Sequence, residues 1–179
     1  MEDRFIEENV RHRLILSGIA ELEEHGIAGF SLRRAAVAAQ VSCAAPYRHF
    51  KDKEEYINEI ISYVGSKWEL LYKEINAIFK DDPASLVIET SIARLRFRIA
   101  NRNLPLALAH TRPSGNGIDG SIESAVMEYC RAKNLSESEA ELLSFTALSI
   151  IYGAVSMVAD DNSDKVFELT RKALGEKFR

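Results

Sequence analysis

Basic residues gather in a short stretch near the N-terminus of a chain that is otherwise acidic. From Gly26 to Lys53 the chain has five Lys and Arg residues and one acidic residue, Asp52, so this stretch carries +4 while the 179-residue chain carries −4. Local positive charge of this kind attracts phosphate groups, and the acidic remainder keeps the chain in solution. The basic residues are Arg33, Arg34, Arg48, Lys51 and Lys53.

The same stretch has the pattern of two short helices separated by a tight turn. Ser31 is a good N-cap, and apolar residues recur after it at helical spacing. Ser42 is a second N-cap, so we predict a helix over residues 43–50 that is short enough to lie in a major groove. The pattern predicts a helix-turn-helix unit over residues 31–50, with candidate DNA contacts from Ser31, Arg33, Arg34, Ser42, Cys43, Ala44, Ala45, Tyr47, Arg48, His49, Lys51 and Lys53.

The second of these helices offers few long side chains, because it begins with a cysteine and two alanines. We therefore expect Arg33 to read a guanine, and Tyr47, Lys51 and Lys53 to contact phosphates. Cys43 leaves two interpretations open, a redox switch or a small residue that allows close approach to the groove.

Residues 26–56 resemble the DNA-binding arm of the TetR family of transcriptional regulators. The family pattern ends in Tyr-x-His/Tyr-Phe and a Lys-rich start to the fourth helix, which corresponds here to residues 47–54, YRHFKDKE. Three positions depart from the pattern. Gln40 replaces the usual turn glycine, so we expect a turn without the positive φ that glycine adopts easily. Ala45 replaces a small hydroxyl residue, and Pro46 falls in the first turn of the recognition helix.

The resemblance implies a cytoplasmic, homodimeric repressor that binds double-stranded operator DNA and is released from it by a small-molecule effector. It also implies that helix four transmits the effector's signal. Two alternatives stay open. One is an all-α small-molecule-binding protein without a role on DNA, and the other is a cofactor-dependent enzyme that uses the glycine-rich segment at residues 115–120.

Composition favours an all-α protein that folds without cofactor or metal. Apolar residues make up 46% of the chain, only four prolines and nine glycines interrupt it, and segments with strand-like alternation are scarce. The two cysteines, Cys43 and Cys130, form neither a metal-binding spacing nor a disulfide framework, as is typical of a reducing cytoplasm. No constellation of catalytic residues indicates an enzyme, and the N-terminus does not have the pattern of a signal peptide.

About nine helices are expected in two domains, a DNA-binding domain at residues 1–52 and a ligand-binding and dimerisation domain at 53–179. Helix one should end at Gly26, and helix four should run from about Asp52 to Lys80. Asp82 should cap the next helix, with Pro83 at its first position. Ser136-x-x-Glu139 is a capping box. The remaining helices are expected at about 121–133, 137–159 and after 163, with a short segment at 105–110 and a loop at 112–120.

Two sets of residues could suggest a nucleotide or metal site, but the sequence around them does not have the required pattern. Residues 115–120 match Gly-x-Gly-x-x-Gly, but no strand precedes them, which favours a flexible loop over a dinucleotide site. The histidines fit neither the Glu-x-x-His pattern of di-iron bundles nor the His-Glu-x-x-His pattern of zinc enzymes.

Arg94 and Arg98 share one helix face at a spacing of four residues. If that face looks inward, it would bind an anionic ligand, because a guanidinium is rarely buried without a partner; the alternative is an exposed basic stripe. Aromatic and apolar residues on neighbouring helices could enclose a cavity, although ordinary core packing would use the same residues. The candidate pocket residues are Trp68, Tyr72, Arg94, Phe97, Arg98, His110, Met127, Cys130, Phe145 and Tyr152.

The segment 142–159 carries no charge over eighteen residues, which raises the question of a membrane span. Its hydroxyl residues, tyrosine and glycine make it too polar, so we expect a helix that packs on the core with one face and on a second subunit with the other. The expected dimer contacts are Ser149, Gly153, Ser156, Val166, Leu169, Ala173 and Leu174.

Overall fold

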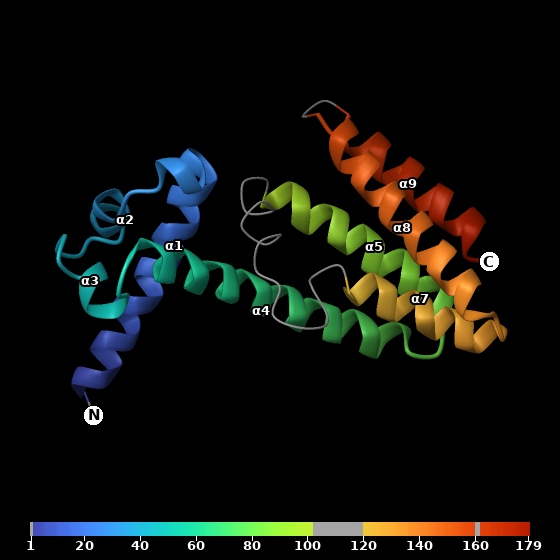
Figure 1. The fold of residues 1–179 in the computed structure, drawn as a ribbon, viewed down its shortest axis with the longest axis horizontal. Coiled ribbons are helices and arrows are strands. Elements are labelled where there is room, and N and C mark those ends of the chain that lie inside the picture. The colour runs from blue at the N-terminus through green and yellow to red at the C-terminus, as the bar shows by residue number, and fades with distance from the viewer. Residues whose placement is uncertain (1, 102–119, 160–161) are drawn as a thin grey trace. The chain divides into compact units, whose positions relative to one another are not determined.

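The computed structural model describes residues 2–101, 120–159 and 162–179. In these ranges the chain forms eight α-helices and no strand, which confirms the all-α prediction (Figure 1). The segment predicted at 105–110 lies outside the described residues, as does nearly all of the predicted loop at 112–120. The helices are α1 (Glu2–Gly29), α2 (Leu32–Ala38), α3 (Pro46–His49), α4 (Lys53–Phe79), α5 (Pro83–Ala100), α7 (Gly120–Lys133), α8 (Glu137–Met157) and α9 (Ser163–Lys177).

The first two helices are interrupted and capped as the sequence predicts. Gly26 breaks the regular part of α1, with φ of 64° and ψ of −179°, a conformation that a residue without Cβ adopts at little cost. Ser31 is the N-cap of α2, and its hydroxyl accepts a hydrogen bond from the backbone N–H of Arg34 at 3.4 Å.

Two later helix starts also match their predicted caps. The carboxylate of Asp82 accepts the N–H of Ser85 at 3.1 Å, and Pro83 is the first residue of α5, where its missing N–H has no cost. At the start of α8, the Ser136 hydroxyl accepts the N–H of Glu139 at 3.3 Å, while the Glu139 carboxylate accepts the N–H of Ser136 at 2.8 Å. This reciprocal pair confirms the capping box.

The described residues divide into two compact units. Unit 1 comprises residues 2–67 and 101, and unit 2 comprises residues 68–100, 120–159 and 162–179. The division falls inside α4, so this helix contributes its first half to one unit and its second half to the other. The domain boundary predicted at 52/53 stays a prediction.

The core of unit 1 is built around three aromatic rings. The rings of Phe50 and Tyr56 are stacked with centres 4.1 Å apart, and Phe30 meets Tyr56 edge-on at 5.3 Å. The buried Tyr56 hydroxyl donates to the carbonyl of Leu14 at 2.5 Å, and burial raises the pKa of Tyr56 to about 12. These contacts hold α4 against α1 and fix the end of α3, because Phe50 directly follows α3.

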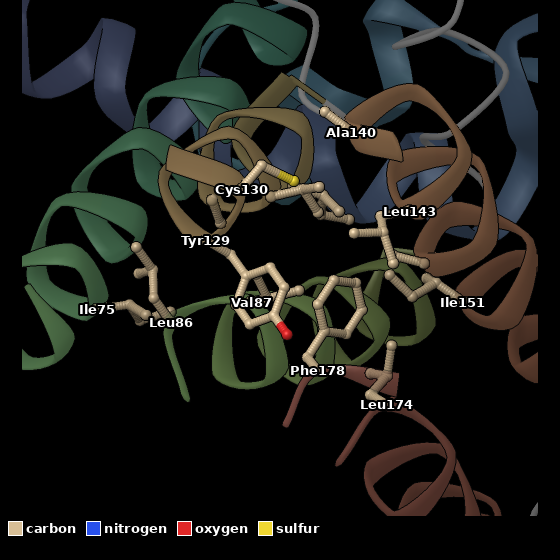
Figure 2. Packing of buried hydrophobic residues seen from close by; sticks show 14 of the residues in the cluster. Ile75, Leu86, Val87, Tyr129, Cys130, Ala140, Leu143, Ile151, Leu174 and Phe178 are labelled. Carbon is tan, nitrogen blue, oxygen red and sulfur yellow. The ribbon is translucent and has the colours of Figure 1, made fainter. Parts of the chain in front are cut away.

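Unit 2 is organised around α5, which packs against α7, α8 and α9. Its apolar core includes Leu174 of α9, which is fully buried. The rings of Tyr129 and Phe178 meet edge-on with centres 5.2 Å apart (Figure 2). The hydroxyl of Tyr129 donates to the carbonyl of Arg179 at 2.9 Å, so the C-terminal residues are fixed against α7.

Among the described helices, α8 is the one long and apolar enough to cross a membrane, with a mean hydropathy of 1.5 and 28% of that window buried. Length and composition alone do not distinguish a span from a core helix. One side of α8 packs in the core of unit 2, through Ala140, Leu143, Ala147, Ile151 and Ala154. The expectation that α8 does not span a membrane stays a prediction.

Candidate functional site

The turn between α2 and α3 is made with a positive φ, contrary to the prediction from the missing glycine. Gln40 has φ of 55°, in the left-handed region. The N–H of Gln40 donates to the carbonyl of Val37 at 3.0 Å, and the N–H of Val41 donates to that of Ala36 at 3.0 Å, which is the hydrogen-bond pattern of a Schellman motif. Arg13 of α1 donates to the carbonyl of Gln40 at 3.0 Å. These three hydrogen bonds compensate for a conformation that costs a non-glycine residue about 1 kcal/mol.

The helix that follows this turn is shorter than predicted and has a different cap. The predicted helix began after Ser42, whereas α3 runs from Pro46 to His49 and its N-cap position is Ala45. A helix from Cys43 would need a hydrogen bond from residue 46 to the Ser42 carbonyl, and proline has no N–H. The N–H of Ala45 donates to that carbonyl instead, at 2.9 Å, which forms a tight turn before the helix.

Most of the predicted DNA contacts lie on the surface of unit 1. Ala45 is the clear exception, because its side chain is 7% exposed and is therefore unavailable to a groove. Ser31, His49 and Lys53 are partly buried. The exposed members are Arg33, Arg34, Ser42, Cys43, Ala44, Tyr47, Arg48 and Lys51.

Arg34 is held by a buried carboxylate of α1, a partner that sequence reasoning missed. The Nε of Arg34 donates to both carboxylate oxygens of Glu21, at 2.9 and 3.1 Å, and the N–H of Ser31 donates to the same carboxylate at 2.9 Å. Burial of Glu21 by itself would raise its pKa, but the hydrogen bonds from Arg34 and Ser31 and the nearby His25 bring that pKa below its ordinary value. Arg34 thus serves the fold of unit 1.

The N-terminus of α4 is capped by carboxylates of the chain itself. Asp52 accepts the N–H of Glu55 at 2.8 Å, and the Glu55 carboxylate accepts the N–H of Lys51. The Lys53 ammonium lies 3.5 Å from the carbonyl of Ala28 and 5.9 Å from the ring centre of Phe30. Lys53 therefore packs against its own unit, and a phosphate would compete with two acidic side chains for the α4 amides.

Three cations on α2, on α3 and just after α3 have no partner in the described part of the chain. No hydrogen bond or ion pair engages the side chains of Arg33, Arg48 or Lys51. The Tyr47 side chain is also exposed, at 66%, although tyrosine rings are usually half-buried. This arrangement of free charge and an exposed phenol suits contacts with phosphates and base edges.

Some of the predicted pocket residues lie together in unit 2. The rings of Trp68 and Phe97 have centres 5.3 Å apart, and the guanidinium carbon of Arg94 lies 5.3 Å from the first ring centre and 5.8 Å from the second. The Arg98 guanidinium lies 4.4 Å from the ring centre of Tyr152. Arg94 is 3% exposed, which answers one of the alternatives left open for this residue, because it is not part of an exposed stripe.

The other predicted pocket residues do not join this cluster. Cys130 is buried in the apolar core of unit 2, and Tyr72 is partly buried. Met127 and Phe145 are exposed, Phe145 at 69%. His110 lies outside the described residues.

Most of the predicted dimer contacts are accessible, with one correction. Leu174 is fully buried in the core of its own unit, so its side chain does not face a partner, and Val166 packs against the same core. Ser149 and Ser156 are exposed, as are Leu169 and Ala173 of α9. Gly153 has open space where a Cβ would lie. Larger apolar side chains that the prediction omitted are exposed on α8: Leu142, Phe145, Tyr152 and Met157.

Within the described ranges, no three His, Cys, Asp or Glu side chains lie together as a group that could bind a metal ion. The thiol of Cys43 is free and exposed, and that of Cys130 is free and buried. Neither observation decides between the two interpretations of Cys43.

Comparisons with known proteins agree with this geometry. Residues 14–60 match the family model of bacterial regulatory proteins of the tetR family. The protein named "Probable acrEF/envCD operon repressor" of Escherichia coli (strain K12) is 32% identical over 87 residues, which are 49% of this chain and 40% of that protein. The match thus spans less than half of the relative's length.

Two solved structures have the same fold over most of the chain. The TetR family transcriptional regulator PfmR of Thermus thermophilus has a TM-score of 0.69 at 17% identity, covering 93% of this chain and 97% of its own. The transcriptional regulator FadR of Bacillus subtilis, in complex with stearoyl-CoA, has a TM-score of 0.60 at 16% identity, covering 89% and 96%. Residues 14–60 thus match the tetR family of bacterial regulatory proteins, and the chain as a whole has the fold of a TetR family transcriptional regulator.

Proposed function

We propose that this protein is a transcriptional repressor that binds double-stranded operator DNA and leaves it when a small molecule binds. The observation that carries the proposal is that Arg33 of α2, Arg48 of α3 and Lys51 are exposed and lie within the residues that match the family model. The naming of the Escherichia coli relative as an operon repressor supports the direction of regulation. Such a regulator would work in the cytoplasm, where its operator is.

Each exposed residue is proposed to have a distinct role on DNA. Arg33 and Arg48 have long, unpaired guanidinium groups, which suit bidentate contacts with guanine. Tyr47 and Lys51 flank the C-terminal end of α3 and are proposed to contact phosphates. Arg34 is left out of this set, because its guanidinium is engaged by Glu21.

The exposed side of α8 supports a homodimer. Leu142, Phe145, Ser149, Tyr152 and Ser156 recur at spacings of three and four residues, so they form one stripe on the helix, opposite its buried side. Large apolar side chains alternate there with small ones, which allows a second helix to approach closely. In the dimer, the two α3 helices would lie one turn of B-DNA apart, about 34–36 Å.

The effector is proposed to bind unit 2. The solved complex of FadR from Bacillus subtilis with stearoyl-CoA supports a ligand in this fold. Because α4 contributes to both units, a ligand that favours one position of its second half would shift the population of dimers whose spacing fits DNA.

Selection of DNA fragments from a random pool by the purified protein tests the DNA role. We expect an enriched palindromic sequence, and Lys51→Ala should flatten the slope of log affinity against log salt by about one unit. Lys80→Ala is the matched control, because Lys80 is exposed in unit 2 and should leave the slope unchanged. A pool without enrichment would favour the alternative of an all-α small-molecule-binding protein.

Sedimentation tests the dimer. Gly153→Arg should place an unpaired charge in the apolar contact and yield monomers, with collapse of DNA binding, because one arm makes half of the contacts. Gly65→Arg is the control, since Gly65 is also a helical glycine with open space around its missing Cβ. A Gly153→Arg variant that stays dimeric would move the interface elsewhere.

A further inference from the structure

We infer that the ligand of unit 2 is a carboxylate on an apolar body, and that its carboxylate binds the polar face of α5, formed by Thr90, Ser91, Arg94 and Arg98. The inference rests on the proposed ligand response and names the chemical class of its ligand. The spacing of the two arginines indicates a possible anion site, whereas neither Thr90 nor Ser91 stands out in a helical sequence.

The four residues lie on one side of a single helix. At 3.6 residues per turn, positions 90, 91, 94 and 98 fall within an arc of about 100°. Helix α5 is the central helix of unit 2, with contacts to α7, α8 and α9. The polar face is therefore positioned by the core of the unit. Thr90 and Ser91 are fully buried, and Arg94 is 3% exposed.

The two hydroxyls lack a hydrogen-bond partner in the described structure. Six other helical hydroxyls of the described chain instead donate to a backbone carbonyl three or four residues earlier, at 2.7 to 3.1 Å. Those hydroxyls belong to Ser17, Ser66, Ser124, Thr146, Ser156 and Thr170.

The same local bond is geometrically open to Thr90 and Ser91, and their burial makes its absence costly, since a buried unsatisfied hydroxyl destabilises a fold by about 1–3 kcal/mol. A persistent cost of this kind is typical of groups kept for a ligand. A carboxylate has only acceptor atoms, so it can accept from both hydroxyls at once.

The guanidinium groups are held by aromatic faces. Arg94 lies over the rings of Trp68 and Phe97, and Arg98 lies over the ring of Tyr152. Stacking engages the flat face of a guanidinium and leaves the N–H groups at its edge able to donate. The Nε of Arg98 is buried without a hydrogen bond in the described structure.

One guanidinium nitrogen of Arg94 and the Nε of Arg98 are buried without a hydrogen bond to the described residues, so each has a donor open to an acceptor. A planar carboxylate matches the fork of N–H donors on a guanidinium. The rings of Trp68, Phe97 and Tyr152 supply apolar surface for the remainder of the ligand, which sets the class as an acid with an apolar body rather than a small inorganic anion.

Tryptophan fluorescence can measure binding at this face directly, because Trp68 is the single tryptophan of the chain. The probes are two acids, dodecanoate and 3-phenylpropanoate, each paired with the alcohol of the same carbon skeleton. We expect at least one acid to bind about 10 to 100-fold more tightly than its alcohol, the range given by charge-assisted hydrogen bonds. Equal affinities within both pairs would overturn the inference.

Arg94→Gln should remove the preference for the acid, while Arg96→Gln should keep it. Arg96 is a matched control because it lies two residues away on α5 and is exposed, against the ring of Phe167. If the two variants lose the preference for the acid equally, that preference comes from the general positive charge of the protein and the proposed binding site is wrong.

Thr90→Val provides a second test that does not depend on the Arg94 variant folding. The substitution keeps the shape and removes the hydroxyl, so the ligand-free protein should become more stable while the affinity for the preferred acid falls about fivefold or more. Unchanged affinity would overturn the role of the hydroxyl. All of these titrations use the full chain without DNA, so their outcome does not depend on DNA binding. A protein that selects no DNA sequence would contradict the proposed repressor function, and it could still bind the acid.

Discussion

The two units of the chain each bury polar side chains, and the hydrogen bonds of those side chains are satisfied to different degrees. In unit 1, the carboxylate of Glu21 accepts hydrogen bonds from Arg34 and Ser31, all within the unit. In unit 2, the buried hydroxyls of Thr90 and Ser91 have no hydrogen-bond partner among the described residues. A buried polar network with every group satisfied stabilises and specifies a fold, whereas unsatisfied groups in a folded core indicate a binding role.

The largest effect is expected from breaking the satisfied network. Glu21→Gln leaves the Arg34 guanidinium without its carboxylate and should destabilise unit 1 by about 2–3 kcal/mol, less than a fully buried pair because Arg34 is half exposed. Chemical denaturation followed by circular dichroism measures the loss. Glu24→Gln is the control, since the Glu24 side chain is 78% exposed and should cost at most about 0.5 kcal/mol. Equal losses in the two variants would remove the contrast between the units.

Acid should reduce the difference between wild type and Glu21→Gln. The pKa of Glu21 is below its ordinary value in the folded chain, so its ionised form contributes stability above the unfolded pKa of about 4.5. That contribution is lost as the pH falls through the folded pKa, because the protonated carboxyl no longer pairs with Arg34. Melting temperatures of the two proteins should therefore converge below pH 4.5, whereas a constant gap would mean that Glu21 acts through packing alone.

A substitution in unit 2 is expected to increase stability, where Glu21→Gln decreases it. Thr90→Val removes a hydroxyl without a partner and should stabilise the ligand-free protein by about 1 kcal/mol. Thr170→Val is the matched control, because the Thr170 hydroxyl donates to the carbonyl of Val166 at 2.7 Å and its loss should not stabilise. If both variants lose stability, the polar face of α5 is satisfied like the network of unit 1, and the comparison fails.

The smallest effect concerns the turns at the ends of α2 and α7. Gln40 and Asn134 both have positive φ, 55° and 54°, with equivalent hydrogen bonds. Gln40→Gly should stabilise unit 1 by about 0.5–1 kcal/mol, while Asn134→Gly should change unit 2 by less, because asparagine tolerates this conformation better than glutamine. Thermal denaturation of both variants measures the difference, and equal shifts would mean that the hydrogen bonds alone determine these turns.

The elements of the fold that depend on local chemistry could be predicted from the sequence. The N-caps at Ser31 and Asp82, the capping box at Ser136 and the interruption at Gly26 are settled by interactions across three or four residues. The basic cluster could also be predicted, because charge needs no tertiary structure to be counted.

Other features depend on contacts between segments distant in the sequence, and the sequence alone does not indicate them. Arg34 and Glu21 are thirteen residues apart on different helices, so their pairing was missed, and so was the inward position of Ala45. Leu174 continues an apolar stripe that also holds the exposed Leu169 and Ala173, and periodicity cannot tell core from interface. The start of α3 could have been predicted, since Pro46 cannot donate the hydrogen bond that a longer helix requires.

Helix α4 has a consequence for how this protein melts. Its 27 residues contribute Tyr56 to the core of one unit and Ile75 to the core of the other. Unfolding either unit would expose the middle of a continuous helix, and a helix is costly to nucleate again once it is broken. The two units should therefore melt in a single cooperative transition, although each has its own core.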